Sequence, residues 1–137
     1  MLFLKDFLPK IKFLIVSTFS IILIKFFLKF LSFNTMIKKI KDISKFLATE
    51  DNSDISIKQI RMWYVKLNRL LKIRSCFVNS LAQKIIFSFF GYDLSVICGI
   101  KFDNQSNFKG HAWLSYKNQI IFEENNKIQD YVESFKV

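Results

Sequence analysis

The 137-residue chain has only two cysteines, Cys76 and Cys98, and a single histidine, His111. Two cysteines in a chain of this size do not make a disulfide scaffold. No CxxC pair or Cys/His cluster has the spacing of a zinc site, so we expect no metal. A reducing cytoplasm is the simplest compartment. Each cysteine is then either a small buried apolar residue or a reactive thiol.

Arginine is also scarce, with three among 21 basic residues in a chain of net charge +10. Because arginine is the residue favoured for forked contacts to phosphates and bases, we do not expect a nucleic-acid partner. The positive charge belongs to residues 1–100, since residues 101–137 are balanced. A solvated basic face is the simplest explanation. An anionic membrane surface or an acidic peptide is the functional alternative.

The most hydrophobic segment is residues 11–31, but its uninterrupted apolar and hydroxyl run, 13–24, lies between Lys12 and Lys25. A membrane-spanning helix needs about 20 apolar residues. The run continues into Lys-Phe-Phe-Leu-Lys rather than a small-residue cleavage site, so we expect no cleaved signal. We predict a buried or membrane-surface helix, with a membrane anchor as the alternative.

The remaining pattern changes from helical to strand-like along the chain. Helical spacing covers residues 36–48 and 56–72, on either side of a polar break at 49–53. In the second of these helices Ile57, Ile60, Leu67, Leu70 and Leu71 are predicted to face inward, with Trp63 and Tyr64 in the core rather than on a binding surface.

A further helix is predicted over residues 76–90, with Ser75 as its N-cap and Gly91 just after its end. Strands are predicted at 93–101, 110–116 and 119–122, the last two joined by a Lys117-Asn118 turn. The tail is weakly helical at best. This order predicts an α+β protein with an N-terminal helical region (1–50) and a core (54–137), in which a central helix packs on a small antiparallel sheet.

Three residues have a pattern that suits thiol chemistry. Cys76 begins the predicted helix, where free N–H groups and the helix dipole favour a thiolate and can bind an oxyanion. His111 lies in a predicted strand and can donate or accept a proton near neutral pH. An acid at the end of the next strand, Glu123 or Glu124, can orient the imidazole. The chain order of nucleophile, histidine and acid is papain-like.

The hairpin register leaves the acid undecided at this stage. A three-residue loop from Tyr116 to Asn118 places Glu123 opposite His111, whereas a two-residue loop places Glu124 there. Neighbouring residues in a strand face opposite ways, so only one of the two can serve. Cys98 lies in mid-strand and is predicted to be a buried apolar residue. Trp113 shares a strand face with His111 and is predicted to pack beside the imidazole.

The stretch from Ser75 to Glu123 resembles the transglutaminase-like core of the lasso-peptide leader peptidases. That family has a cysteine before an apolar residue, then a small residue, Leu and Ala, a helix-ending glycine, an apolar strand with glycine, a His-Ala-Trp run and a later acid. The matching residues are Cys76, Phe77, Ser80, Leu81, Ala82, Gly91, Val96 to Ile100, His111 to Trp113, and Glu123. The chain departs from the family in having Glu rather than Asp, and in lacking a proline shortly before the cysteine. Family spacing favours Glu123 over Glu124.

The resemblance implies a cysteine peptidase that removes the leader from a lasso-peptide precursor before ring closure. Cys76, His111 and Glu123 would be its catalytic residues, with the N–H of Cys76 in the oxyanion hole and no cofactor. It also implies three partners: the precursor's leader region, a separate leader-recognition protein and an ATP-dependent cyclase. Membrane contact through residues 11–31 would accompany a cytoplasmic location. The alternatives are another transglutaminase-like acyl transferase and a non-enzymatic, membrane-associated basic interaction protein.

Overall fold

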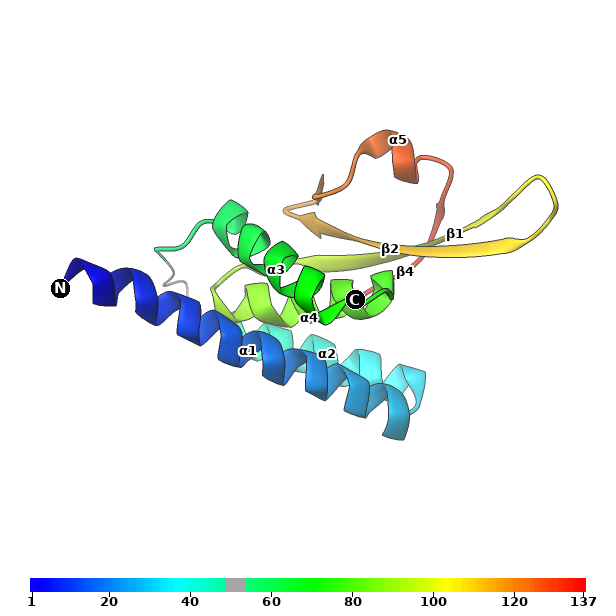
Figure 1. The fold of residues 1–137 in the computed structure, drawn as a ribbon. Helices are drawn as coiled ribbons and strands as arrows, with labels where there is room; N and C mark the ends of the chain where they lie inside the picture. Colours follow the sequence, from blue (N-terminus) through cyan, green and yellow to red (C-terminus); the bar gives the residue numbers. More distant parts are fainter. Residues whose placement is uncertain (49–53) are drawn as a thin grey trace.

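The structure is a computed structural model that describes residues 1–48 and 54–137, so the predicted polar break at 49–53 lies outside the described residues. The α+β class is confirmed, because helices precede a small antiparallel sheet of strand order β3-β2-β1-β4 (Figure 1). The helices are α1 (Leu2–Phe30), α2 (Phe33–Leu47), α3 (Ile57–Leu71), α4 (Cys76–Phe89) and the short α5 (Asn125–Ile128). The strands are β1 (Ser95–Phe102), β2 (Phe108–Tyr116), β3 (Gln119–Ile121) and β4 (Val132–Lys136).

Helix α4 is the centre of the fold and lies between the sheet and the pair α1 and α2 (Figure 1). Every residue from Ser80 to Ser88 is buried, as expected of a helix covered on all sides. The Ser75 side chain accepts a hydrogen bond from the Val78 N–H at 3.3 Å. At the other end Gly91 has φ 85°, and its N–H donates to the Ser88 carbonyl at 3.0 Å. Both predicted ends of this helix are confirmed.

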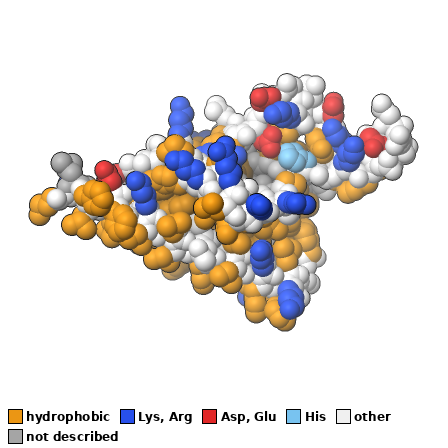
Figure 2. All heavy atoms as spheres, in the orientation of Figure 1, with side chains coloured by type: hydrophobic (Ala, Val, Ile, Leu, Met, Phe, Trp, Pro, Cys, Tyr) orange, Lys and Arg blue, Asp and Glu red, His pale blue; other side chains and the backbone are white. Residues whose placement is uncertain are grey.

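Helix α1 has one side in the core and one side exposed. Phe13, Ile21, Ile24 and Phe27 are buried, whereas large apolar residues such as Phe19 are exposed. Figure 2 shows these apolar side chains along the edge that α1 forms. The span Phe3–Phe30 is long and apolar enough to cross a membrane, but a core helix passes the same test. Its composition is therefore only a weak indication of membrane association.

The sequence allows either Asp54 or Ser56 to cap α3, and in the structure the Ser56 side chain does so by accepting a hydrogen bond from the Gln59 N–H at 3.2 Å. Ile60 and Tyr64 are buried in the core. The expected burial of Leu70 and Leu71 is wrong, since these side chains are 80% and 50% exposed. The fully buried residues of α3 lie in its first half, and its last turn extends past the core.

The tail is not weakly helical throughout, because its last residues form β4. This strand pairs antiparallel with β1, opposite the β2 edge, and Val96 and Val137 exchange two backbone hydrogen bonds at 3.0 and 2.8 Å. Only Phe135 within β4 is even partly buried. A short edge strand with one inward side chain has too little alternation to be recognised in the sequence.

Candidate active site

Cys76 is the first residue of α4 and its side chain is partly buried. The Ser75 cap takes the Val78 N–H, and the Asn79 N–H donates to the Ser75 carbonyl at 3.0 Å. Among the described residues, none accepts a hydrogen bond from the N–H of Cys76. The sulfur therefore lies at a helix N-terminus that still has a free donor.

His111 comes from β2 and is held on several sides. Its Nε2 lies 3.0 Å from Oε1 of Glu123. The Trp113 ring stacks on the imidazole with centroids 6.1 Å apart, which confirms the expected packing, and the Tyr131 ring lies 5.6 Å away. Gly99 is the cross-strand partner of His111 on β1, and its missing side chain leaves room for the Trp113 ring. The imidazole is thus fixed by one carboxylate and two aromatic rings.

The contact between Glu123 and His111 does not follow from the register of the hairpin. Tyr116 pairs with Gln119, so the turn is the two-residue loop, and continuing that register would place Glu124 opposite His111. The strand instead ends at Ile121, because Phe122 has φ 65° and leaves the ladder. This backbone change turns the side chain of Glu123 toward the imidazole. The prediction that β3 extends through residue 122 is wrong, while family spacing indicated the acid that binds His111.

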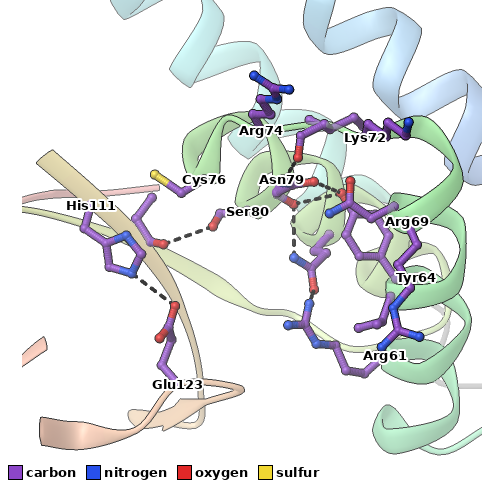
Figure 3. Close-up of a pocket in the computed structure, with 15 residues that line it drawn as sticks. Arg61, Tyr64, Arg69, Lys72, Arg74, Cys76, Asn79, Ser80, His111 and Glu123 are labelled. Atoms are coloured by element: carbon purple, nitrogen blue, oxygen red, sulfur yellow. Dashed lines mark hydrogen bonds and ion pairs between the residues drawn. The ribbon is translucent and has the colours of Figure 1, made fainter. Parts of the chain in front are cut away.

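The structure brings Cys76, His111 and Glu123 to one cavity of about 650 Å³ (Figure 3). Cys76 approaches from the start of α4, and the His111–Glu123 pair lies on the side formed by the sheet. Ser80, one turn further along α4, donates to the Ala112 carbonyl at 3.4 Å. This bond ties the helix that carries the cysteine to the strand that carries the histidine.

A polar network that sequence reasoning missed shapes the loop before Cys76. Tyr64 donates to Oδ1 of Asn79 at 2.6 Å, and Nδ2 of Asn79 donates to the Ile73 carbonyl at 2.9 Å. Burial raises the pKa of the Tyr64 phenol, so the phenol keeps its proton for this bond. The expectation that Tyr64 belongs to the core is confirmed, but it also lines the cavity. Asparagine one turn after a helix-starting cysteine is the only sequence signal of this network.

A second, apolar groove of about 380 Å³ begins on the other side of Cys76 and His111. Its lining includes the aromatic residues Phe33, Phe77, Phe108 and Phe135. Phe77 follows Cys76 directly, and its ring lies 6.4 Å from that of Phe135. Cys76 and His111 therefore lie where a polar cavity and an apolar groove meet.

Cys98 is buried, as predicted, with 7% of its surface exposed. Burial, and secondarily the neighbouring Cys76, raises the pKa of the Cys98 thiol to about 11. A thiol in that environment stays protonated and is a poor nucleophile at neutral pH. Across residues 1–48 and 54–137 there is no group of three His, Cys, Asp or Glu side chains that could hold a metal ion.

The fold and the site define an α+β protein with a cysteine at a helix N-terminus facing a histidine–carboxylate pair on a sheet. A family model of the transglutaminase-like superfamily matches residues 22–136. The chain therefore belongs to the transglutaminase-like superfamily. Comparison with curated proteins and with solved structures finds no match. Membership supports a cysteine peptidase or acyl transferase activity.

Proposed function

We propose that this chain is a cysteine peptidase that removes the leader from a ribosomally made lasso-peptide precursor before the macrolactam ring is closed. The observation that carries the proposal is the 3.0 Å hydrogen bond between His111 and Glu123, in a cavity that Cys76 also lines. The superfamily match and the motif from Ser75 to Glu123 support the same chemistry.

Glu123 would set the protonation of the imidazole. An ionised carboxylate only accepts hydrogen bonds, so Nε2 of His111 carries the proton in the 3.0 Å contact. Nδ1 is then the ring nitrogen left to exchange a proton with the sulfur of Cys76 and with the substrate. Trp113 and Tyr131 hold the ring plane in place while the proton moves.

The reaction would proceed through a thioester. The Cys76 thiolate attacks the carbonyl carbon at the leader–core junction, and the free N–H of Cys76 donates to the resulting oxyanion. The tetrahedral intermediate collapses, and the imidazolium of His111 gives its proton to the departing core amine. His111 then takes a proton from water, which attacks the thioester carbon. Collapse releases the leader as a carboxylic acid and returns the sulfur.

The partners would be the leader region of the precursor, a separate leader-recognition protein that presents it, and an ATP-dependent cyclase that takes the freed core. The exposed apolar side of α1, which carries Phe7, Phe19 and Phe26, would rest on a membrane surface from the cytoplasmic side. The lysines on the adjacent N-terminal segments favour an anionic surface.

The test is cleavage of a precursor presented with its recognition protein, followed by mass spectrometry. Cys76→Ala and His111→Ala should each lower the cleavage rate by at least about 10³-fold, and Glu123→Gln by about 10²- to 10⁴-fold. Cys98→Ala is the matched control and should cleave at the wild-type rate. Equal cleavage by all four variants would exclude the proposed site.

The same reaction can separate a peptidase from an acyl transferase. In one reaction that contains both water and an added peptide amine, a transferase would deliver the leader mainly as the amide of that amine, whereas a peptidase would release it mainly as the free acid. Transfer to a peptide amine in preference to water, with the same dependence on Cys76, would replace the peptidase proposal by the transferase.

A further inference from the structure

The cavity beside Cys76 is strongly basic. All three arginines of the chain, Arg61, Arg69 and Arg74, line it together with Lys72. Among the described residues, Glu123 is the only carboxylate in its lining, and it is bound to His111. In Figure 2, Lys and Arg side chains gather around the hollow in which the histidine is visible. Glu123 also interacts electrostatically with Arg61, and the described lining keeps an excess of positive charge.

Among the described residues, few basic side chains have a carboxylate partner, and the cations of this cavity are not among them. Lys84, Lys109 and Lys127 each lie within 4 Å of an aspartate or glutamate oxygen. In the part of the chain that the structure describes, neither Arg69 nor Arg74 forms such a pair. Lys72 has no carboxylate partner there either. Mutual repulsion between like charges in one cavity favours binding an anion.

These cations are positioned by ordered structure, so they form a built surface. Lys72 caps α3 in the left-handed conformation with φ 52°, and Arg74 lies two residues before Cys76 in the loop that Asn79 holds. Arg61 on α3 donates to Oε1 of Gln83 at 2.5 Å. The four cations thus come from α3, from its C-cap and from the loop that leads into α4 (Figure 3).

The predominance of arginine over lysine in this cavity indicates what kind of anion it binds. The chain otherwise uses lysine, yet three of the four cations at this cavity are arginine, whose planar fork matches a carboxylate. The cavity of about 650 Å³ is concave and adjoins the cysteine, which suits a peptide segment better than a flat membrane. The groove on the other side of Cys76 is lined by phenylalanines and would take an apolar side chain.

We infer that the substrate is an acidic peptide, with one or more Asp or Glu side chains close to the bond that Cys76 attacks, held by Arg61, Arg69, Lys72 and Arg74. This inference rests on the proposed function, because it names the substrate class of that same site. The carboxylates bind in the basic cavity, and the chain then crosses Cys76 toward the apolar groove. Cleavage is therefore selective for precursors with acidic residues on one side of the junction.

Binding can be measured without catalysis, using full-length Cys76→Ala protein and fluorescence anisotropy. The probe is a rhodamine-labelled glutamate-rich peptide, compared with a matched peptide that has glutamine at each glutamate. We expect the glutamate peptide to bind about tenfold more tightly, and the triple variant Arg69→Gln, Lys72→Gln, Arg74→Gln to abolish that preference. The preference should also shrink as salt is raised.

The matched control is a triple variant with the same loss of charge on surfaces outside the cavity: Lys58→Gln, Lys66→Gln and Lys117→Gln. All three lysines are exposed and none lines the basic cavity. This control should keep the preference for the glutamate peptide. An equal loss in both triple variants would show attraction to net charge alone and would overturn the inference. An oligonucleotide or an anionic vesicle that binds more tightly through the same three residues would also overturn it.

A cleavage assay with the wild-type cysteine separates this inference from the proposed function. Cleavage of glutamate and glutamine precursors at equal kcat/KM would leave the peptidase standing and remove the acidic specificity. Selective binding of the glutamate peptide with no cleavage of either precursor would do the reverse. Selective cleavage of the glutamate precursor that the first triple variant loses would support both.

Discussion

Replacing Gly99 with alanine should destabilise the protein, because the new methyl group has no space. A Cβ at this position would lie 2.5 Å from Cη2 and 2.7 Å from Cζ3 of Trp113, and 3.0 Å from Cβ of Tyr131. Trp113 is only 6% exposed and its ring is confined between His111 and Tyr131. The indole therefore cannot move without displacing the imidazole or β2.

The size of the effect follows from overpacking in a confined site. Forcing an additional methyl group into a packed core costs about 1–3 kcal/mol. With a urea dependence of about 1–3 kcal/mol per molar, a loss of about 2 kcal/mol lowers the unfolding midpoint by roughly 1 M. Because the displaced ring supports His111, we also expect slower cleavage by the folded variant.

The assay is urea unfolding followed by tryptophan fluorescence and circular dichroism. Gly110→Ala is the matched control, since its Cβ would meet Cε1 of Phe108 at 3.9 Å and the Gly99 carbonyl oxygen at 4.0 Å, which are ordinary contacts. That variant should stay within about 0.5 kcal/mol of wild type. A Gly99→Ala protein as stable as Gly110→Ala would refute the reasoning about Trp113.

Three further outcomes are expected. At pH 8, iodoacetamide should modify Cys76 but not Cys98, because burial raises the pKa of the Cys98 thiol to about 11. Cys98 should react only at high pH or after unfolding. Equal labelling of the two cysteines at pH 8, measured by mass spectrometry, would contradict this. Ser75→Ala should cost about 1 kcal/mol in thermal unfolding, because its side chain caps α4, whereas Ser75→Asp should retain the stability. Lys84→Ala should cost about 2–4 kcal/mol, because Lys84 is only 5% exposed and its ammonium donates to the Leu94 carbonyl at 2.6 Å. An unchanged unfolding temperature would show that the carbonyl finds another partner.

The parts of the fold that local chemistry determines could be predicted from the sequence. Ser56 and Ser75 cap their helices, and Gly91 ends α4, because each needs only neighbouring residues in the chain. Lys117 and Asn118 have φ 50° and 63° and form the turn that was predicted there, with the shorter of the two loop lengths that the sequence left open. The α+β order follows from these ends and the change of period between them.

The parts that depend on distant partners could not be predicted. Burial of Leu70 requires a neighbour beyond the last turn of α3, and none of the described residues covers this side chain, which is 80% exposed. The strand β4 exists because β1 offers it a free edge, not because its own pattern alternates. The basic cavity could not be predicted either. Arg61 and Arg74 are 13 residues apart in the sequence, and their charges were interpreted as part of an ordinary solvated face.

Both local sequence and distant contacts determine which acid binds His111. Local pairing alone, with the two-residue turn, indicates Glu124, and the structure reaches Glu123 only because Phe122 adopts φ 65°. A bulky residue in that conformation costs about 1–2 kcal/mol, so the surroundings must compensate. The Phe122 ring lies 5.7 Å from that of Phe87 in α4 and 4.7 Å under the guanidinium of Arg61 in α3. The backbone break that delivers Glu123 to the imidazole is thus held by two helices remote in sequence, and one of them also supplies a cation to the basic cavity.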